Sequence, residues 1–108
     1  MAGISFRGKN LRAELQVNSI SVELNPFTEQ FLARTIVGAV SSLKGAEVIE
    51  TLEVVLEKSD LRIVVNSNEL QLTPFPKDII VNTIKGMVSS LKGVGKIDTL
   101  RMRVGIEG

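Results

Sequence analysis

Hydrophobic and polar residues alternate along several short segments of this chain. The alternation covers residues 11–17, 20–24, 52–56, 61–65 and 100–104. A period of two is typical of strands that bury one face, because successive side chains point to opposite sides of a sheet. Turn-forming residues at 18–19 and 66–68 separate two pairs of such segments, so each pair is predicted to form a hairpin.

Two longer segments follow the helical period instead, with apolar residues three and four positions apart. We expect a broad apolar stripe to cover each helix and to face the core. The first stripe comprises Phe27, Phe31, Leu32, Thr35, Ile36, Ala39, Val40 and Leu43, and the second Phe75, Ile79, Ile80, Thr83, Ile84, Met87, Val88 and Leu91.

Capping signals predict where these helices begin and end. Asn25 and Thr73 are expected N-caps, and each is followed by a proline at the first helical position, where a missing N–H is tolerated. A lysine in the last turn and a following glycine are expected to end each helix. These C-terminal pairs are Lys44 with Gly45 and Lys92 with Gly93.

The sequence of residues 18–57 recurs at residues 66–105. We call the constant shift in residue number between the two copies the repeat offset. These two segments are identical at 17 of 40 aligned positions, and the block VSSLKG occurs at both 40–45 and 88–93. We therefore predict an internal duplication of a ββαβ unit, with repeats at about 11–57 and 59–106 and pseudo-twofold symmetry. The third strands of the two units are expected to pair at the centre of the sheet.

The predicted fold class is α+β, in a single domain spanning residues 1–108. We expect a two-layer sandwich in which two helices cover one face of an antiparallel sheet of six or seven strands. The seventh strand would come from Ile4 and Phe6, which precede Leu52 and Val54 by the repeat offset. A ferredoxin-like order and a clamp-like duplicated unit remain open alternatives for the strand order.

Composition excludes several kinds of chemistry. The chain has no histidine or cysteine, so no thiol or imidazole catalysis and no typical zinc, copper or iron–sulfur site is available. We predict no catalytic residue, no cofactor and no metal site, and we therefore expect that the protein is not an enzyme. A magnesium-dependent activity would have to use Asp60 and Asp98, but no spacing of acidic residues supports it. With no signal peptide, no membrane-spanning segment and no disulfide, a cytoplasmic location is expected.

Small residues recur along one border of each predicted helical stripe, and we treat them as a possible interaction site. A mid-helix glycine costs about 1 kcal/mol relative to alanine, so a nearby group is expected to compensate. The favoured explanation is close approach of the two helices to each other; the other is a groove for a ligand or a partner helix. These residues are Thr35, Gly38 and Ser42 in the first helix and Thr83, Gly86 and Ser90 in the second.

Charge differs between the two halves although the whole chain has a net charge of only +1. Residues 1–57 contain five basic and seven acidic residues, whereas 58–108 contain eight and five. On the uncovered sheet face, Glu53 is expected to pair with a cross-strand arginine. The possible basic surface consists of Arg62, Lys96, Arg101 and Arg103. A nucleic-acid reader would normally add stacking aromatics, which this face lacks.

The strings VNSISVELNPFTEQFLARTIVGAVSSLKG and VNSNELQLTPFPKDIIVNTIKGMVSSLKG resemble short uncharacterised archaeal proteins with a hairpin, a Pro-Phe helix start and a VSSLK-type helix end. The resemblance implies a cytoplasmic archaeal protein and no catalytic residue. The function predicted from the sequence is a small non-enzymatic module that binds a protein partner or itself, in the latter case as a homodimer. The alternative is a nucleic-acid-binding protein that uses the basic second repeat.

Overall fold

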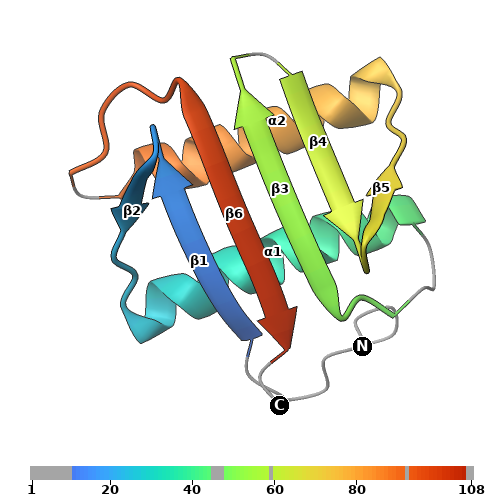
Figure 1. Ribbon diagram of the computed structural model, residues 1–108, viewed down its shortest axis with the longest axis horizontal. Helices are drawn as coiled ribbons and strands as arrows, with labels where there is room; N and C mark the ends of the chain where they lie inside the picture. The colour runs from blue at the N-terminus through green and yellow to red at the C-terminus, as the bar shows by residue number, and fades with distance from the viewer. Residues whose placement is uncertain (1–10, 45–47, 59, 92, 107–108) are drawn as a thin grey trace.

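The computed structural model describes residues 11–44, 48–58, 60–91 and 93–106 (Figure 1). The possible strand at Ile4 and Phe6 therefore lies outside the described residues. In chain order, the elements are β1 (Leu11–Val17), β2 (Ile20–Val22), α1 (Pro26–Lys44), β3 (Thr51–Glu57), β4 (Asp60–Val65), β5 (Asn68–Leu70), α2 (Pro74–Ser89) and β6 (Thr99–Ile106).

The strands form one open antiparallel sheet in the order β2-β1-β6-β3-β4-β5. The predicted α+β class is confirmed, and the sheet has six strands within the described residues. The third strands of the two predicted units, β3 and β6, pair at the centre as expected, with Val54 opposite Met102. Each hairpin therefore lies beside the third strand of the other half, since β1 pairs with β6 and β4 pairs with β3.

The register of pairing follows the repeat offset found in the sequence. Leu15 of β1 lies opposite Met102 of β6. The repeat offset relates Leu15 to Ile63 and Met102 to Val54, and Ile63 and Val54 also lie opposite each other. Exchanging every element of one half for its counterpart in the other leaves the strand order unchanged.

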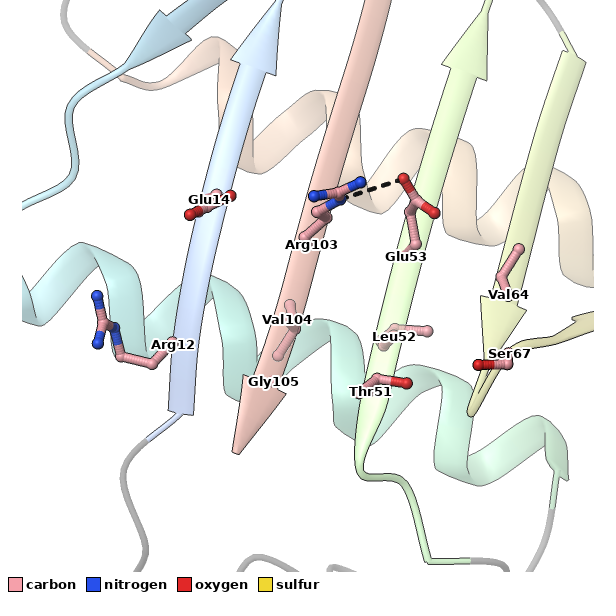
Figure 2. Close-up of a pocket in the computed structure, with 10 residues that line it drawn as sticks. All are labelled: Arg12, Glu14, Thr51, Leu52, Glu53, Val64, Ser67, Arg103, Val104 and Gly105. Carbon is pink, nitrogen blue, oxygen red and sulfur yellow. Dashed lines mark hydrogen bonds and ion pairs between the residues drawn. The ribbon is translucent and has the colours of Figure 1, made fainter. Parts of the chain in front are cut away.

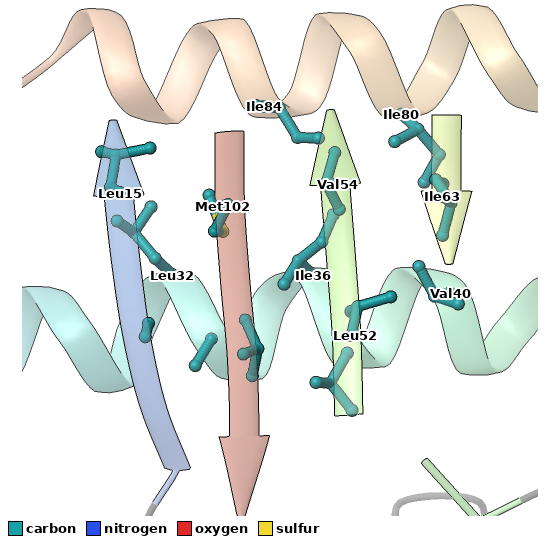
Figure 3. Packing of buried hydrophobic residues seen from close by; sticks show 14 of the residues in the cluster. Leu15, Leu32, Ile36, Val40, Leu52, Val54, Ile63, Ile80, Ile84 and Met102 are labelled. Atoms are coloured by element: carbon teal, nitrogen blue, oxygen red, sulfur yellow. The ribbon is translucent and has the colours of Figure 1, made fainter. Parts of the chain in front are cut away.

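Both helices lie on the same side of the sheet and run in opposite directions (Figure 1). The four longer strands bury every second residue, as the alternation predicted, and β1 shows this along its whole length. The short edge strands β2 and β5 bury none of their residues, so the prediction is wrong for Ile20, which is exposed. Burying one large aliphatic side chain contributes about 1.5–3 kcal/mol, so the core is the main source of stability. Its fully buried members include Leu32, Ile36, Val54, Ile80, Ile84 and Met102 (Figure 3).

The predicted helical stripes are wrong for several of their largest members. Phe27, Phe31, Leu43, Phe75 and Ile79 are all exposed. Apolar residues cover much of the circumference of both helices, so their spacing alone did not fix the centre of the buried side. The buried side of α1 is instead formed by Leu32, Ala33, Ile36, Val37 and Val40.

Both hairpin turns have two residues. Asn18 and Ser19 have φ values of 53° and 68°, and Asn66 and Ser67 have 50° and 72°. Asparagine tolerates this left-handed conformation better than most residues, and two such residues in succession match the twist of a hairpin. Asn68, which the sequence placed in the second turn, begins β5 instead.

Asn18 also joins its hairpin to the loop before β6. Its side-chain Nδ2 donates to the carbonyl oxygen of Lys96 at 2.8 Å. Its Oδ1 accepts from the backbone N–H groups of Asp98 at 2.8 Å and Thr99 at 3.0 Å. The side chain of Asn18 therefore fixes a segment that lies far away in the sequence.

Asn66 makes the corresponding bonds in the other half of the molecule. Its Nδ2 donates to the carbonyl oxygen of Val48 at 2.8 Å. Its Oδ1 accepts from the N–H groups of Glu50 at 2.8 Å and Thr51 at 3.0 Å. Each hairpin asparagine thus orients the chain entering a central strand.

The two helix starts differ in their capping. Asn25 is an N-cap as predicted, because its Oδ1 accepts from the backbone N–H of Thr28 at 2.7 Å. Thr73 occupies the N-cap position of α2 as predicted, but its side chain makes no capping hydrogen bond. A proline begins both helices, as the sequence indicated.

The second helix ends earlier than predicted. α2 stops at Ser89, and Lys92, predicted for its last turn, lies outside the described residues. The backbone N–H of Ser90 bonds to the carbonyl of Met87, three residues back, and this tighter pattern ends the α-helix. Gly93 has a φ of 87°, the left-handed conformation expected there, but it follows an intervening turn. Gly45 lies outside the described residues.

Candidate interaction surfaces

The uncovered face of the sheet bears paired charges. One carboxylate oxygen of Glu53, on β3, lies 3.5 Å from Nε of both Arg101 and Arg103, on the neighbouring β6. The predicted cross-strand pairing of Glu53 is therefore confirmed. All three side chains are partly exposed, so these ion pairs contribute little to stability.

The possible basic surface is divided and locally neutralised. Arg62, on β4, lies 4.0 Å from a carboxylate oxygen of Glu69. Lys96 lies in the loop before β6, off the strands, with its Nζ 3.9 Å from a carboxylate oxygen of Asp98. Each of the four predicted basic residues thus has an acidic neighbour, which reduces the positive potential available to a phosphate backbone.

A shallow hollow of about 470 Å³ opens on the same face around Gly105 (Figure 2). No atom lies within 4 Å of the position that a Cβ of Gly105 would occupy. Figure 2 shows Arg103 directed toward Glu53, while Arg12 lies on the β1 side of the hollow. Its lining includes both acidic and basic side chains, so the hollow offers no single charge to a ligand. This hollow was not predicted from the sequence, although a glycine within a strand was an available signal.

The edge strands of the sheet are short, and part of the β1 edge is covered by polar side chains. The edge strands β2 and β5 have three residues each. Beyond β2, the side chain of Gln30 accepts from the N–H of Leu11 at 3.3 Å and donates to its carbonyl oxygen at 2.6 Å. Glu29 accepts from the N–H of Ala13 at 2.8 Å. These bonds occupy backbone groups of β1 that another strand would need.

The outward faces of the helices expose large apolar side chains. Phe27 is 76% exposed and Phe31 52%, and their counterparts Phe75 and Ile79 are 74% and 47% exposed. The two α1 rings stack on each other, with centroids 6.0 Å apart and ring planes 19° apart. Large apolar residues thus occupy the same two positions on both helices.

The small residues predicted as an interaction site continue these exposed positions. On each helix, residues spaced by four, four, three and four positions form one line along the axis. We call these lines the outer stripes; none of their residues is charged. They consist of Phe27, Phe31, Thr35, Gly38 and Ser42 on α1, and Phe75, Ile79, Thr83, Gly86 and Ser90 on α2 and its C-cap.

The glycines of the outer stripes do not mediate contact between the two helices. A Cβ built on Gly38 or Gly86 would meet no neighbouring atom within 4 Å. The favoured explanation from the sequence, close approach of α1 to α2 at these residues, is therefore wrong. Ser42 and Ser90 donate to the carbonyl oxygens of these glycines, at 3.0 Å and 3.1 Å. Their hydroxyl protons are thus already used within each helix.

No protein-family model, curated protein or solved structure matches this chain. Among the helices of the described residues, none is long and apolar enough to cross a membrane.

Proposed function

We propose that this chain is a protein-interaction module that binds a protein partner or itself through the outer stripes. The main observation behind the proposal is that four large apolar side chains of the outer stripes are exposed: Phe27, Phe31, Phe75 and Ile79. The outer stripes contain no charged residue. Single exposed apolar residues are common on protein surfaces and need no explanation. A grouped and repeated set indicates a surface that another molecule covers.

The contacts within the chain support this assignment. The rings of Phe27 and Phe31 already stack, which presents one aromatic surface. Aromatic residues are enriched at the energetically important centres of protein interfaces. Beside them, Gly38 and Gly86 leave open space into which a partner backbone fits. The outer stripes therefore combine large apolar side chains with a position near the middle of each helix where no side chain projects.

We also propose that the fold is a two-layer sandwich made by duplication of a ββαβ unit, with a pseudo-twofold axis near the Val54–Met102 pair. The strand order and the repeat offset in the register of pairing support this proposal. The corresponding bonds of Asn18 and Asn66 support it further. A duplicated unit explains why the outer stripes occur twice.

Nucleic-acid binding through the second half has less support. Arg101 and Arg103 share a carboxylate with Glu53, and Arg62 and Lys96 each have an acidic neighbour. A protein that neutralises phosphates binds more weakly as salt rises, so binding with a steep salt dependence would favour this alternative.

Site-specific photocrosslinking tests the proposed interaction surface. A benzophenone amino acid replaces Phe31, and a matched control replaces Ile20, a hairpin residue that is 69% exposed. We expect a discrete protein adduct from position 31, in purified protein or in a cell extract, and none from position 20. No discrete adduct from position 31, or the same adducts from both positions, would overturn the proposal.

A further inference from the structure

We propose that the partner of the outer stripes is a second copy of this chain, bound helix layer to helix layer about a twofold axis. This inference rests on the proposed function, because it identifies what covers the surface assigned there. The footprint of the molecule, its charge, its repeated stripes and the protected β1 edge of its sheet support this occupant.

The helical face is large enough for a stable dimer. The molecule measures 36 × 32 × 22 Å, and the shortest dimension runs through the sheet and the helices behind it (Figure 1). The helical face therefore lies within the 36 × 32 Å outline. A standard interface buries roughly 800 Å² on each partner, which this outline accommodates.

The charge distribution also suits contact between identical copies. In a twofold contact, a charged group near the axis meets its own copy and is repelled, so uncharged surface near the axis favours self-association. The outer stripes contain no charge, and the net charge of the chain is only +1. Repulsion along the stripes, or between the net charges of two copies, therefore does not oppose a dimer through these helices.

The repetition of the outer stripes favours an isologous contact, in which both copies use the same surface. α1 and α2 run in opposite directions, and their stripes have aromatic or aliphatic residues at one end and small residues toward the other (Figure 1). A second copy can thus place its large residues against the small residues of the first. Gly38 and Gly86 provide the space, since no atom of their own chain occupies it.

Association through the β1 edge of the sheet is a less favourable route to a dimer. The edge strands β2 and β5 are short, and Gln30 and Glu29 occupy backbone groups of β1 beyond β2. A second copy would have to displace these bonds to add a strand. The outer stripes require no such rearrangement.

Sedimentation equilibrium and native mass spectrometry of the full chain test the inference. We expect a species of twice 11.7 kDa that dissociates on dilution. The double substitution Phe31→Glu/Ile79→Glu places charge on both outer stripes. It should weaken dimerisation by at least about 30-fold, the effect of losing one interface hot spot.

Two further double variants separate the interface from the fold. Gln16→Glu/Gln71→Glu adds the same charge at exposed positions outside the outer stripes and should dimerise like the wild type. Gly38→Leu/Gly86→Leu fills the open space, so it should keep the native circular dichroism spectrum but lose the dimer. A dimer that persists in both outer-stripe variants would overturn the inference, as would a wild type that is monomeric at millimolar concentration.

The photocrosslinking experiment distinguishes failure of the homodimer inference from failure of the proposed interaction module. A monomeric wild type whose position 31 crosslinks to a different protein in a cell extract would overturn the homodimer and retain the interaction module. A monomer without any adduct from that position would overturn both. An adduct in the purified protein, at twice the monomer mass, supports both.

Discussion

The side-chain hydrogen bonds of Asn18 connect the first hairpin to the loop before β6, and replacing this residue measures their contribution. The substitution Asn18→Gly removes the amide but retains the backbone freedom that a φ of 53° requires. The resulting loss of stability therefore reports the side-chain bonds rather than backbone strain.

The expected loss follows from the three bonds that Asn18 makes, at 2.8, 2.8 and 3.0 Å. A protein hydrogen bond contributes about 0.5–1.5 kcal/mol net, and these three lie at the surface, where water replaces them in part. If each of the three bonds contributes an amount in the lower or middle part of that range, Asn18→Gly lowers the free energy of unfolding by about 2 kcal/mol. For a domain of this size, that change lowers Tm by roughly 10 °C.

Denaturant unfolding followed by far-ultraviolet circular dichroism is the appropriate assay, because the chain has neither tryptophan nor tyrosine for fluorescence. Ser19→Gly is the matched control: it changes the neighbouring left-handed residue and leaves the three bonds of Asn18 in place. We expect the control to be neutral or slightly stabilising. A loss below about 0.5 kcal/mol for Asn18→Gly, the lower limit for one hydrogen bond, would refute the reasoning.

Three further variants test other parts of the structure. Gly38→Ala/Gly86→Ala should raise the free energy of unfolding by about 1–2 kcal/mol in protein diluted to the monomer. Alanine loses less backbone entropy than glycine in a helix, and the added Cβ meets open space at both positions. A destabilised variant would restore the helix-packing explanation. Glu53→Gln should cost less than about 1 kcal/mol in denaturant unfolding, and the loss should shrink in high salt, since both ion pairs are partly exposed; a loss independent of salt contradicts this. Gln30→Ala should lower the free energy of unfolding by about 1–2 kcal/mol and increase aggregation measured by light scattering, because it frees two backbone groups on the edge of β1. Unchanged stability and unchanged scattering would contradict a protective role for Gln30.

The candidate surface was only partly predictable from the sequence. The repeat offset identified Thr35, Gly38 and Ser42 and their counterparts as a shared feature of both helices. It did not indicate which way they face, because the apolar residues of each helix extend over too wide an arc. Phe27 and Phe31 were consequently expected in the core, whereas the structure exposes them.

The sequence by itself determined the local elements of this protein. Alternating apolar residues define the strands, Asn-Ser pairs define the hairpin turns, and Asn25 with Pro26 begins the first helix. These features depend on side chains that lie within a few positions of each other, so a local pattern is enough to specify them.

Only the tertiary structure decided how the two halves combine. It pairs each hairpin with the third strand of the other half, divides the basic residues among acidic neighbours, and turns the outer stripes toward solvent. These outcomes depend on contacts between residues far apart in the sequence, and the sheet determines which side of each helix is buried. A helix whose apolar residues surround most of its axis does not encode that choice locally.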